Sequence, residues 1–160
     1  MIWHDKYNTA NNDYDIAVMK VDPPFEFGAT TEPVDLPGNG YVDDNWGIIA
    51  GWGYYLIPGN VLSEDLRFAR IPKVDRNTCS NDYAGLYDIT PQQVCYGYQQ
   101  GGIDSCKGDS GGPLFTKELI IIGIISWGED CAGRRSPGVY TTIFLLTDWI
   151  AEKTGVRSRL

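Results

Sequence analysis

The stretch Asp104–Leu114 reads D-S-C-K-G-D-S-G-G-P-L and places a serine, Ser110, among glycines. Gly108, Gly111 and Gly112 allow the backbone to turn sharply and to approach a substrate closely. They also leave N–H groups free to face a developing negative charge. A serine is a weak nucleophile until a base, usually a histidine, removes its proton. The stretch therefore predicts a nucleophilic serine and raises the question of its base.

The order of acid, base and serine along the chain separates the known arrangements of such a site. The 160 residues contain one histidine, His4, which precedes Ser110 by more than a hundred positions. α/β-Hydrolases need a histidine after the serine, and subtilisin-type enzymes need one between the acid and the serine. Neither arrangement is present, so both are excluded as working enzymes. Only the order histidine, aspartate, serine stays open.

The composition indicates a packed globular protein without a polyanionic partner. Apolar residues make up 42% of the chain, and its formal net charge is −8. This charge argues against nucleic-acid binding, which needs a basic face, and against binding to an anionic membrane surface. The longest apolar stretch, Leu119–Ile125, is too short to span a bilayer and indicates a buried strand.

The cysteines favour disulfides over a metal site. The four cysteines lie at positions 79, 95, 106 and 131, without a C-x-x-C pair and far from the single histidine. We therefore expect no metal, two disulfides and an oxidising compartment, with three pairings open. The N-terminal M-I-W-H-D-K-Y has no features of a signal peptide. We expect that Met1 is not the biological start and that the chain is a fragment.

Short apolar runs separated by Gly, Pro, Asn and Asp clusters predict an antiparallel all-β fold. Loop signals lie at 23–33, 37–40 and 57–60. We expect a short helix after Lys73 and a terminal helix over about Leu145–Lys153, followed by Gly155 as its stop. The expected strands are Asp15–Val21, Trp46–Trp52, Asp65–Ile71, Gln93–Tyr96, Pro113–Phe115, Leu119–Trp127 and Gly138–Thr142.

The stretch Asp104–Pro113 closely resembles the signature of trypsin-like serine proteases. Other segments resemble that family in the same order, namely Asn12–Val18, Gly51–Gly53, Ser126–Gly128 with Cys131, Ser136–Tyr140 and Asp148–Ile150. The resemblance covers the C-terminal two-thirds of the family's domain. It implies an all-β fold of two six-stranded antiparallel Greek-key barrels with a C-terminal helix, the first barrel being incomplete. Residues 1–45 would hold the remainder of the first barrel and a linker, 46–144 the second barrel and 145–155 the helix.

The resemblance also implies roles for individual residues of the catalytic site. Ser110 would be the nucleophile, and Asp15 would orient the catalytic histidine and stabilise its charged form. The N–H groups of Gly108 and Ser110 would form the oxyanion hole. Asp109 would pair with the amino terminus that zymogen cleavage creates. A strand-edge turn carboxylate is the alternative role for Asp15.

A specificity pocket follows from the same resemblance. Asp104 would lie at its base, where a partly desolvated carboxylate favours a cationic partner, and this implies cleavage after Arg or Lys. Asp104 as a solvated loop acid is the alternative. Ser105 would fill pocket volume, and the walls would be Ser126, Trp127, Gly128 and Gly138. The implied disulfides are Cys79–Cys95 and Cys106–Cys131, the second of which would tie the nucleophile loop to the pocket wall.

The single histidine departs from the family pattern. His4 precedes Asp15 by eleven residues, but I-W-H-D-K-Y resembles the family's I-x-x-H-x-x-Y segment, in which the histidine is not catalytic. We expect a surface or strand-flanking role for His4, because the family's catalytic histidine lies in an earlier A-A-H-C segment. A triad that lacks one member keeps only roughly 10³–10⁴-fold acceleration over water. We therefore expect this chain alone to be inactive or poorly active.

The sequence favours a secreted, zymogen-derived serine endopeptidase that acts through a Ser110 acyl-enzyme. Its expected partners are polypeptides with Arg or Lys at the cleaved position and protein protease inhibitors, and we expect a monomer without a cofactor. The alternative is a non-catalytic protease homologue that acts as a binding or regulatory module. The intact Asp104, Asp109 and Ser110 favour the enzyme. An all-β structural domain with incidental motifs is the weakest of the three interpretations.

Overall fold

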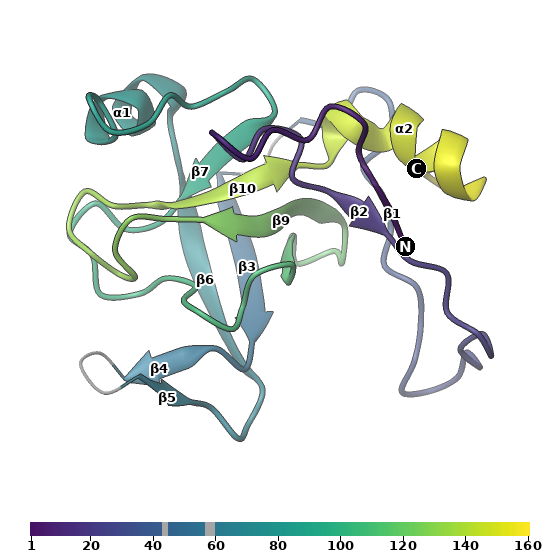
Figure 1. The fold of residues 1–160 in the computed structure, drawn as a ribbon. Coiled ribbons are helices and arrows are strands. Elements are labelled where there is room, and N and C mark those ends of the chain that lie inside the picture. Colours follow the sequence, from purple (N-terminus) through teal and green to yellow (C-terminus); the bar gives the residue numbers. More distant parts are fainter. Residues whose placement is uncertain (43–44, 57–59) are drawn as a thin grey trace.

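A closed barrel of six antiparallel strands forms the centre of the computed structural model, which describes residues 1–42, 45–56 and 60–160. Around the barrel the strands follow the order β10-β7-β6-β3-β8-β9 (Figure 1). Their bounds are β3 (Trp46–Gly51), β6 (Arg67–Val74), β7 (Gln93–Tyr96), β8 (Pro113–Phe115), β9 (Ile121–Trp127) and β10 (Gly138–Thr142). The expected all-β fold with a six-stranded antiparallel barrel is confirmed.

The barrel interior is filled by aliphatic and tyrosine side chains. Ile71, Leu114 and Tyr140 are fully buried, and Tyr140 meets Tyr96 edge-on with ring centroids 6.0 Å apart. Successive strand residues point to opposite faces, so each strand delivers every second side chain to this core. At Gly123 an added Cβ would lie 3.1 Å from the Leu114 side chain. The core therefore depends on a small residue at that position.

The other strands form two short sheets outside the barrel. β1 (Ile2–Trp3) pairs with β2 (Ala17–Val18), and β4 (Tyr54–Leu56) pairs with β5 (Val61–Leu62). The expected strand over Asp15–Val21 is thus limited to two residues, because β1 offers only two partners. The β4–β5 pair was not expected from the sequence. Positions 57–59 of the loop signal between these two strands lie outside the described residues.

Both expected helices are present. α1 (Arg76–Asp82) begins after Asp75, whose side chain accepts a hydrogen bond from the Thr78 N–H at 3.0 Å. The disulfide Cys79–Cys95 joins α1 to β7. The 3₁₀ turn η1 (Phe144–Leu146) leads into α2 (Thr147–Thr154), which ends at Gly155 in the left-handed conformation, as expected. No helix in the described residues is long and apolar enough to cross a membrane.

Candidate active site

The turn that carries Ser110 is fixed to strand β9. The Gly111 N–H donates to the Ile125 carbonyl at 2.8 Å, and the Ile125 N–H donates to the Gly112 carbonyl at 2.9 Å. Gly111 has a φ of 81°, a conformation that favours glycine. Ser110 itself is exposed. The turn therefore presents the Ser110 side chain to solvent from a backbone that the barrel holds in place.

Asp109 ties the same turn to the segment after β3. Its Oδ1 accepts a hydrogen bond from the Gly53 N–H at 2.7 Å, and its Oδ2 accepts one from the Cys106 N–H at 2.9 Å. An added Cβ at Gly51 or Gly53 would overlap the Asp109 carboxylate. The motif G-W-G at 51–53 is thus explained by the close approach of this carboxylate to the backbone.

The two backbone donors expected for an oxyanion hole are free. The carbonyl of Lys107 accepts a hydrogen bond from the Tyr54 N–H at 3.0 Å. In a trans peptide the N–H opposes the carbonyl, so the Gly108 N–H points away from Tyr54. Within the described ranges, neither the Gly108 N–H nor the Ser110 N–H donates to another protein group. Gly108 has a φ of 99°, which a residue with a side chain rarely adopts.

Asp15 is held by two strands of the barrel. Its Oδ2 accepts a hydrogen bond from the Ser126 hydroxyl at 2.6 Å, and its carbonyl accepts one from the Thr141 hydroxyl at 2.9 Å. Ser126 follows Ile125, which anchors the Ser110 turn. Adjacent residues of β9 therefore position both Asp15 and Ser110. The sequence assigned Ser126 to a pocket wall and gave no role to Thr141.

Asp104 begins the segment that leads to Ser110 and is partly removed from solvent. Its oxygens accept hydrogen bonds from the N–H groups of Ser105 at 2.8 Å and Ala132 at 3.3 Å. Burial raises the pKa of Asp104 to about 6, because desolvation penalises its charged form. At Gly138 an added Cβ would lie 2.8 Å from both Asp104 Oδ1 and the Tyr140 hydroxyl. Asp104 is thus a partly desolvated acid.

Of the other expected pocket residues, Ser105 and Gly138 lie next to Asp104 and Gly128 lies next to Gly138. An added Cβ at Gly128 would lie 3.9 Å from Gly138 Cα, so these two glycines face each other. The ring of Trp127 packs edge-on against Tyr83 and Tyr87, with centroids 5.0 and 5.1 Å away. Ser105 Oγ lies 3.3 Å from the Tyr140 hydroxyl. The structure also contains the disulfide Cys106–Cys131, which joins the nucleophile loop to the segment after Trp127.

A cavity of about 710 Å³ was not expected from the sequence. Its lining includes both Asp104 and Asp109, together with apolar side chains such as Ile49 and Phe68, but none of the four expected wall residues. The two carboxylates therefore line this cavity together with residues of β3, β4 and β6. In the described residues, no group of three or more His, Cys, Asp or Glu side chains could hold a metal ion.

His4 is packed away from this site. It follows β1, and its ring stacks on Tyr14 at 4.5 Å and tilts against Trp149 at 4.9 Å between centroids. Its Nδ1 accepts a hydrogen bond from the Lys6 N–H at 3.1 Å. The side chain is buried, so the expected surface role is wrong, whereas the strand-flanking role is confirmed. In the part of the chain that the structure describes, His4 has no hydrogen bond to Asp15 or Ser110.

Comparison with known proteins shows which family the chain belongs to. The protein-family model described as Trypsin matches residues 1–150. The chain belongs to the trypsin family. It is 37% identical over 154 residues to the vitellin-degrading protease of Bombyx mori, covering 95% of this chain and 58% of that protein.

Two longer proteases are similar to the same degree. Identity is 40% over 157 residues to rat transmembrane protease serine 9, covering 94% of this chain and 15% of that protein. The chain is 38% identical over 161 residues to bovine coagulation factor XI, and the match covers 96% of this chain and 25% of that protein. The chain thus spans at most 58% of the length of these three relatives.

The burial of His4 predicts a pH-dependent loss of stability. Desolvation lowers the pKa of His4 below its ordinary value of 6.5, with Lys6 and Lys153 acting in the same direction and Asp5 and Asp13 opposing them. The unfolded chain therefore binds the proton more tightly than the folded chain does. The contribution of neutral His4 is fully present above about pH 6.5 and is lost as the pH falls below that value and through the lowered pKa of the folded state.

Urea unfolding at about pH 7.5 and about pH 5.5 measures this contribution. His4→Phe keeps an aromatic ring between Tyr14 and Trp149 but cannot titrate. We expect the free energy of unfolding to fall more steeply with decreasing pH in the wild type than in His4→Phe. An equal pH dependence of the two proteins would contradict the assignment.

Proposed function

We propose that the protein is a serine endopeptidase in which Ser110 forms the acyl-enzyme. The observation that carries this proposal is the shared use of β9: Ile125 anchors the turn of Ser110, and the next residue, Ser126, binds Asp15. An exposed serine on a rigid turn beside free backbone donors and a held carboxylate fits the geometry that acyl transfer needs. Neither a binding module nor a structural domain requires this combination.

The reaction follows from these positions. Ser110 Oγ attacks the carbonyl carbon of the peptide bond while its proton passes to a histidine that Asp15 orients. The N–H groups of Gly108 and Ser110 stabilise the negative charge on the carbonyl oxygen. Collapse of this intermediate breaks the C–N bond, and the leaving amine takes the proton. Water then attacks the acyl ester and releases the second product and the free Ser110 hydroxyl.

Cleavage after Arg or Lys is the specificity that Asp104 supports. In the part of the chain that the structure describes, two N–H groups donate to the desolvated Asp104 carboxylate, which would gain strongly from a cationic ligand because the ligand replaces lost hydration. The facing glycines at 128 and 138 leave room for a long side chain. A bound guanidinium or ammonium would lower the pKa of Asp104 from about 6 towards its ordinary value.

Asp109 supports activation by a new amino terminus. Its carboxylate lines the 710 Å³ cavity, whose other walls include the apolar side chains of Ile49, Phe68 and Ile125. An ammonium group on an apolar N-terminal residue would find a negative partner and a hydrophobic wall there. Such a zymogen step couples proteolytic activation to the Asp109 contacts that shape the Ser110 turn.

Peptides and protein protease inhibitors are the partners that fit this site, and we propose a monomer acting outside the cell. The two disulfides are consistent with an oxidising compartment. One relative carries the word transmembrane in its name, so membrane attachment of the whole protein is the alternative to secretion.

A non-catalytic homologue is the second candidate function, and one observation favours it. The single histidine of these 160 residues, His4, packs between Tyr14 and Trp149 rather than between Asp15 and Ser110. A protein that works only through this chain would bind peptides without cleaving them. The intact donors, nucleophile and Asp104 support the endopeptidase as the better of the two.

The 160 residues alone are expected to turn over substrate slowly or not at all. They provide no histidine near Ser110 to accept its proton, so only the oxyanion donors and substrate binding contribute. This leaves an acceleration of roughly 10³–10⁴-fold over water. Steady-state hydrolysis of an arginine amide by the purified chain measures it. Turnover comparable to that of an intact protease would contradict the role given to His4.

Asp104→Asn in the full-length protein tests the specificity. The amide keeps the size of Asp104 but removes the charge, so kcat/KM for peptides with Arg at the cleaved position is expected to fall about 100-fold or more. Cleavage of a mixed peptide pool, read by mass spectrometry, should lose its preference for Arg and Lys. Asp88→Asn removes an exposed carboxylate elsewhere and serves as the control. An unchanged preference in Asp104→Asn would contradict the proposed pocket.

A further inference from the structure

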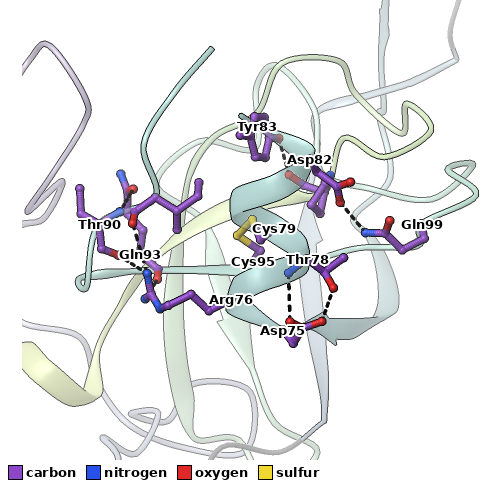
Figure 2. Close-up of a disulfide and its surroundings, with 12 residues drawn as sticks. Asp75, Arg76, Thr78, Cys79, Asp82, Tyr83, Thr90, Gln93, Cys95 and Gln99 are labelled. Carbon is purple, nitrogen blue, oxygen red and sulfur yellow. Dashed lines mark hydrogen bonds between the residues drawn. A yellow bond between two sulfur atoms is a disulfide. The ribbon is translucent and has the colours of Figure 1, made fainter. Parts of the chain in front are cut away.

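The last residue of helix α1, Asp82, carries a carboxylate that bonds to two loops. The Asp82 side chain is only 2% exposed. Its Oδ1 accepts a hydrogen bond from Arg135 Nε at 2.9 Å, and its Oδ2 accepts one from Gln99 Nε2 at 2.8 Å. Figure 2 shows the Gln99 side chain meeting the Asp82 carboxylate at the end of α1. Each carboxylate oxygen therefore has a partner on a different loop.

The position of Asp82 is unfavourable for a negative charge that has no partners. A helix carries a partial negative charge at its C-terminal end, which repels a carboxylate there. Burial also removes water from the carboxylate, and this destabilises the charge unless hydrogen-bond donors replace the water. The guanidinium of Arg135 and the amide of Gln99 are these donors. Loss of either donor would leave a buried charge with one partner fewer.

One of the two loops leads to Asp104, and the other bonds to it. Gln99 lies between the end of β7 and Asp104, whereas Arg135 lies between β9 and β10. The Arg135 N–H donates to the Gln99 carbonyl at 3.0 Å, so the loops also bond through their backbones. Ala132, in the same loop as Arg135, donates its N–H to Asp104 Oδ2 at 3.3 Å. The Asp82 carboxylate thus joins the two segments that determine where Asp104 lies.

The loop between β9 and β10 has a backbone that needs support from outside. Ala132 and Arg135 have φ values of 56° and 55°, which residues with side chains seldom adopt. Such a backbone persists only where surrounding contacts fix it. At Gly101 an added Cβ would lie 2.4 Å from the Ala132 carbonyl oxygen, so the two loops pack closely. The hydroxyl of Tyr83, the C-cap of α1, donates to the Pro137 carbonyl at 2.6 Å and fixes the end of the loop.

Helix α1 is itself fixed to the barrel, so it can serve as a support. The disulfide Cys79–Cys95 joins α1 to β7. The Arg76 guanidinium, at the start of α1, donates to the Gln93 carbonyl, at the start of β7, at 2.8 Å. Figure 2 shows both contacts on the same helix as Asp82. The two loops are therefore held from a rigid element.

We propose that Asp82 is a positioning residue for the selectivity towards Arg and Lys. Its carboxylate fixes the two loops to each other and to α1, and the loops hold Asp104 in place for a basic side chain. This inference rests on the proposed endopeptidase function. Asp82 acts through the loops and touches neither the substrate nor the reacting atoms. Its loss would weaken binding of the basic side chain and spare the chemistry at Ser110, whose turn is bonded to β9.

Asp82→Asn in the full-length protein tests the proposal. The amide keeps the size of the carboxylate but carries no charge, and its NH₂ group faces a second donor. Two measurements are made: hydrolysis of an arginine amide, and calorimetric binding of benzamidine, an aromatic amidinium that resembles the end of an arginine side chain. We expect KM for the amide and Kd for benzamidine to rise about 3- to 10-fold. We expect kcat to stay unchanged.

Neighbouring arginines provide a matched control. Arg135→Gln removes the charged partner of Asp82 and should raise KM and Kd in the same way. Arg134→Gln makes the same chemical change at an exposed side chain that has no hydrogen bond or ion pair within the described residues, and it should leave both constants unchanged. Arg135→Lys keeps the charge and should lie closer to the wild type than Arg135→Gln does. Since the Arg135 side chain is 64% exposed, Arg135→Gln carries the test if Asp82→Asn does not fold.

Amide hydrogen exchange gives a readout that does not depend on activity. Exchange of the Arg135 N–H, which bonds to the Gln99 carbonyl, should become faster in Asp82→Asn and remain at the wild-type rate in Arg134→Gln. Unchanged KM and Kd in Asp82→Asn and Arg135→Gln, or a fall in kcat at constant KM, would overturn the positioning role. Failure of the wild type to hydrolyse the arginine amide would instead contradict the proposed function, and this inference with it.

Discussion

The carboxylate of Asp109 accepts hydrogen bonds from the Gly53 and Cys106 N–H groups, and the loop that carries Ser110 takes its shape from them. Bonds from N–H groups to an ionised carboxylate are among the stronger ones in proteins. They draw the loop against the segment after β3, where only glycine leaves room. The same loop carries the free N–H of Gly108 and the exposed Ser110 side chain. The same carboxylate lines the 710 Å³ cavity, so the proposed catalytic geometry and the proposed activation step would both depend on Asp109.

Consecutive residues of strand β9 contact different parts of the proposed active site. Ile125 bonds the Ser110 turn through its N–H and carbonyl, and Ser126 binds Asp15. The next residue, Trp127, borders a hollow of about 140 Å³ that residues 10–12 also line. Neighbouring strand residues point to opposite faces, which lets one strand serve the core and the cleft together. The loop before Asp15 depends in turn on Gln93 at the start of β7.

The sequence predicted the features that local patterns encode. The strands at 93–96, 113–115 and 138–142 were placed correctly because short apolar runs between turn residues fix their ends. The β4–β5 pair was missed because its turn signal resembles any loop. The Gln93 contacts to Asn11 and Asn12 bridge more than eighty positions, and no local pattern reports them. The burial of His4 depends likewise on the distant Trp149 ring. Local motifs thus predicted the family and the barrel, whereas the long-range contacts and the cavities could be seen only in the folded structure.

Labelling of the full-length protein with a fluorophosphonate probe tests the central claim most directly, since such probes react with a serine only when it is activated as a nucleophile. Mass spectrometry then locates the adduct within the peptide that contains residues 104–114. The account predicts a single adduct on Ser110 that disappears in Ser110→Ala and after heat denaturation. Failure of the native protein to react, or equal labelling of Ser110→Ala, would contradict it and favour the non-catalytic homologue.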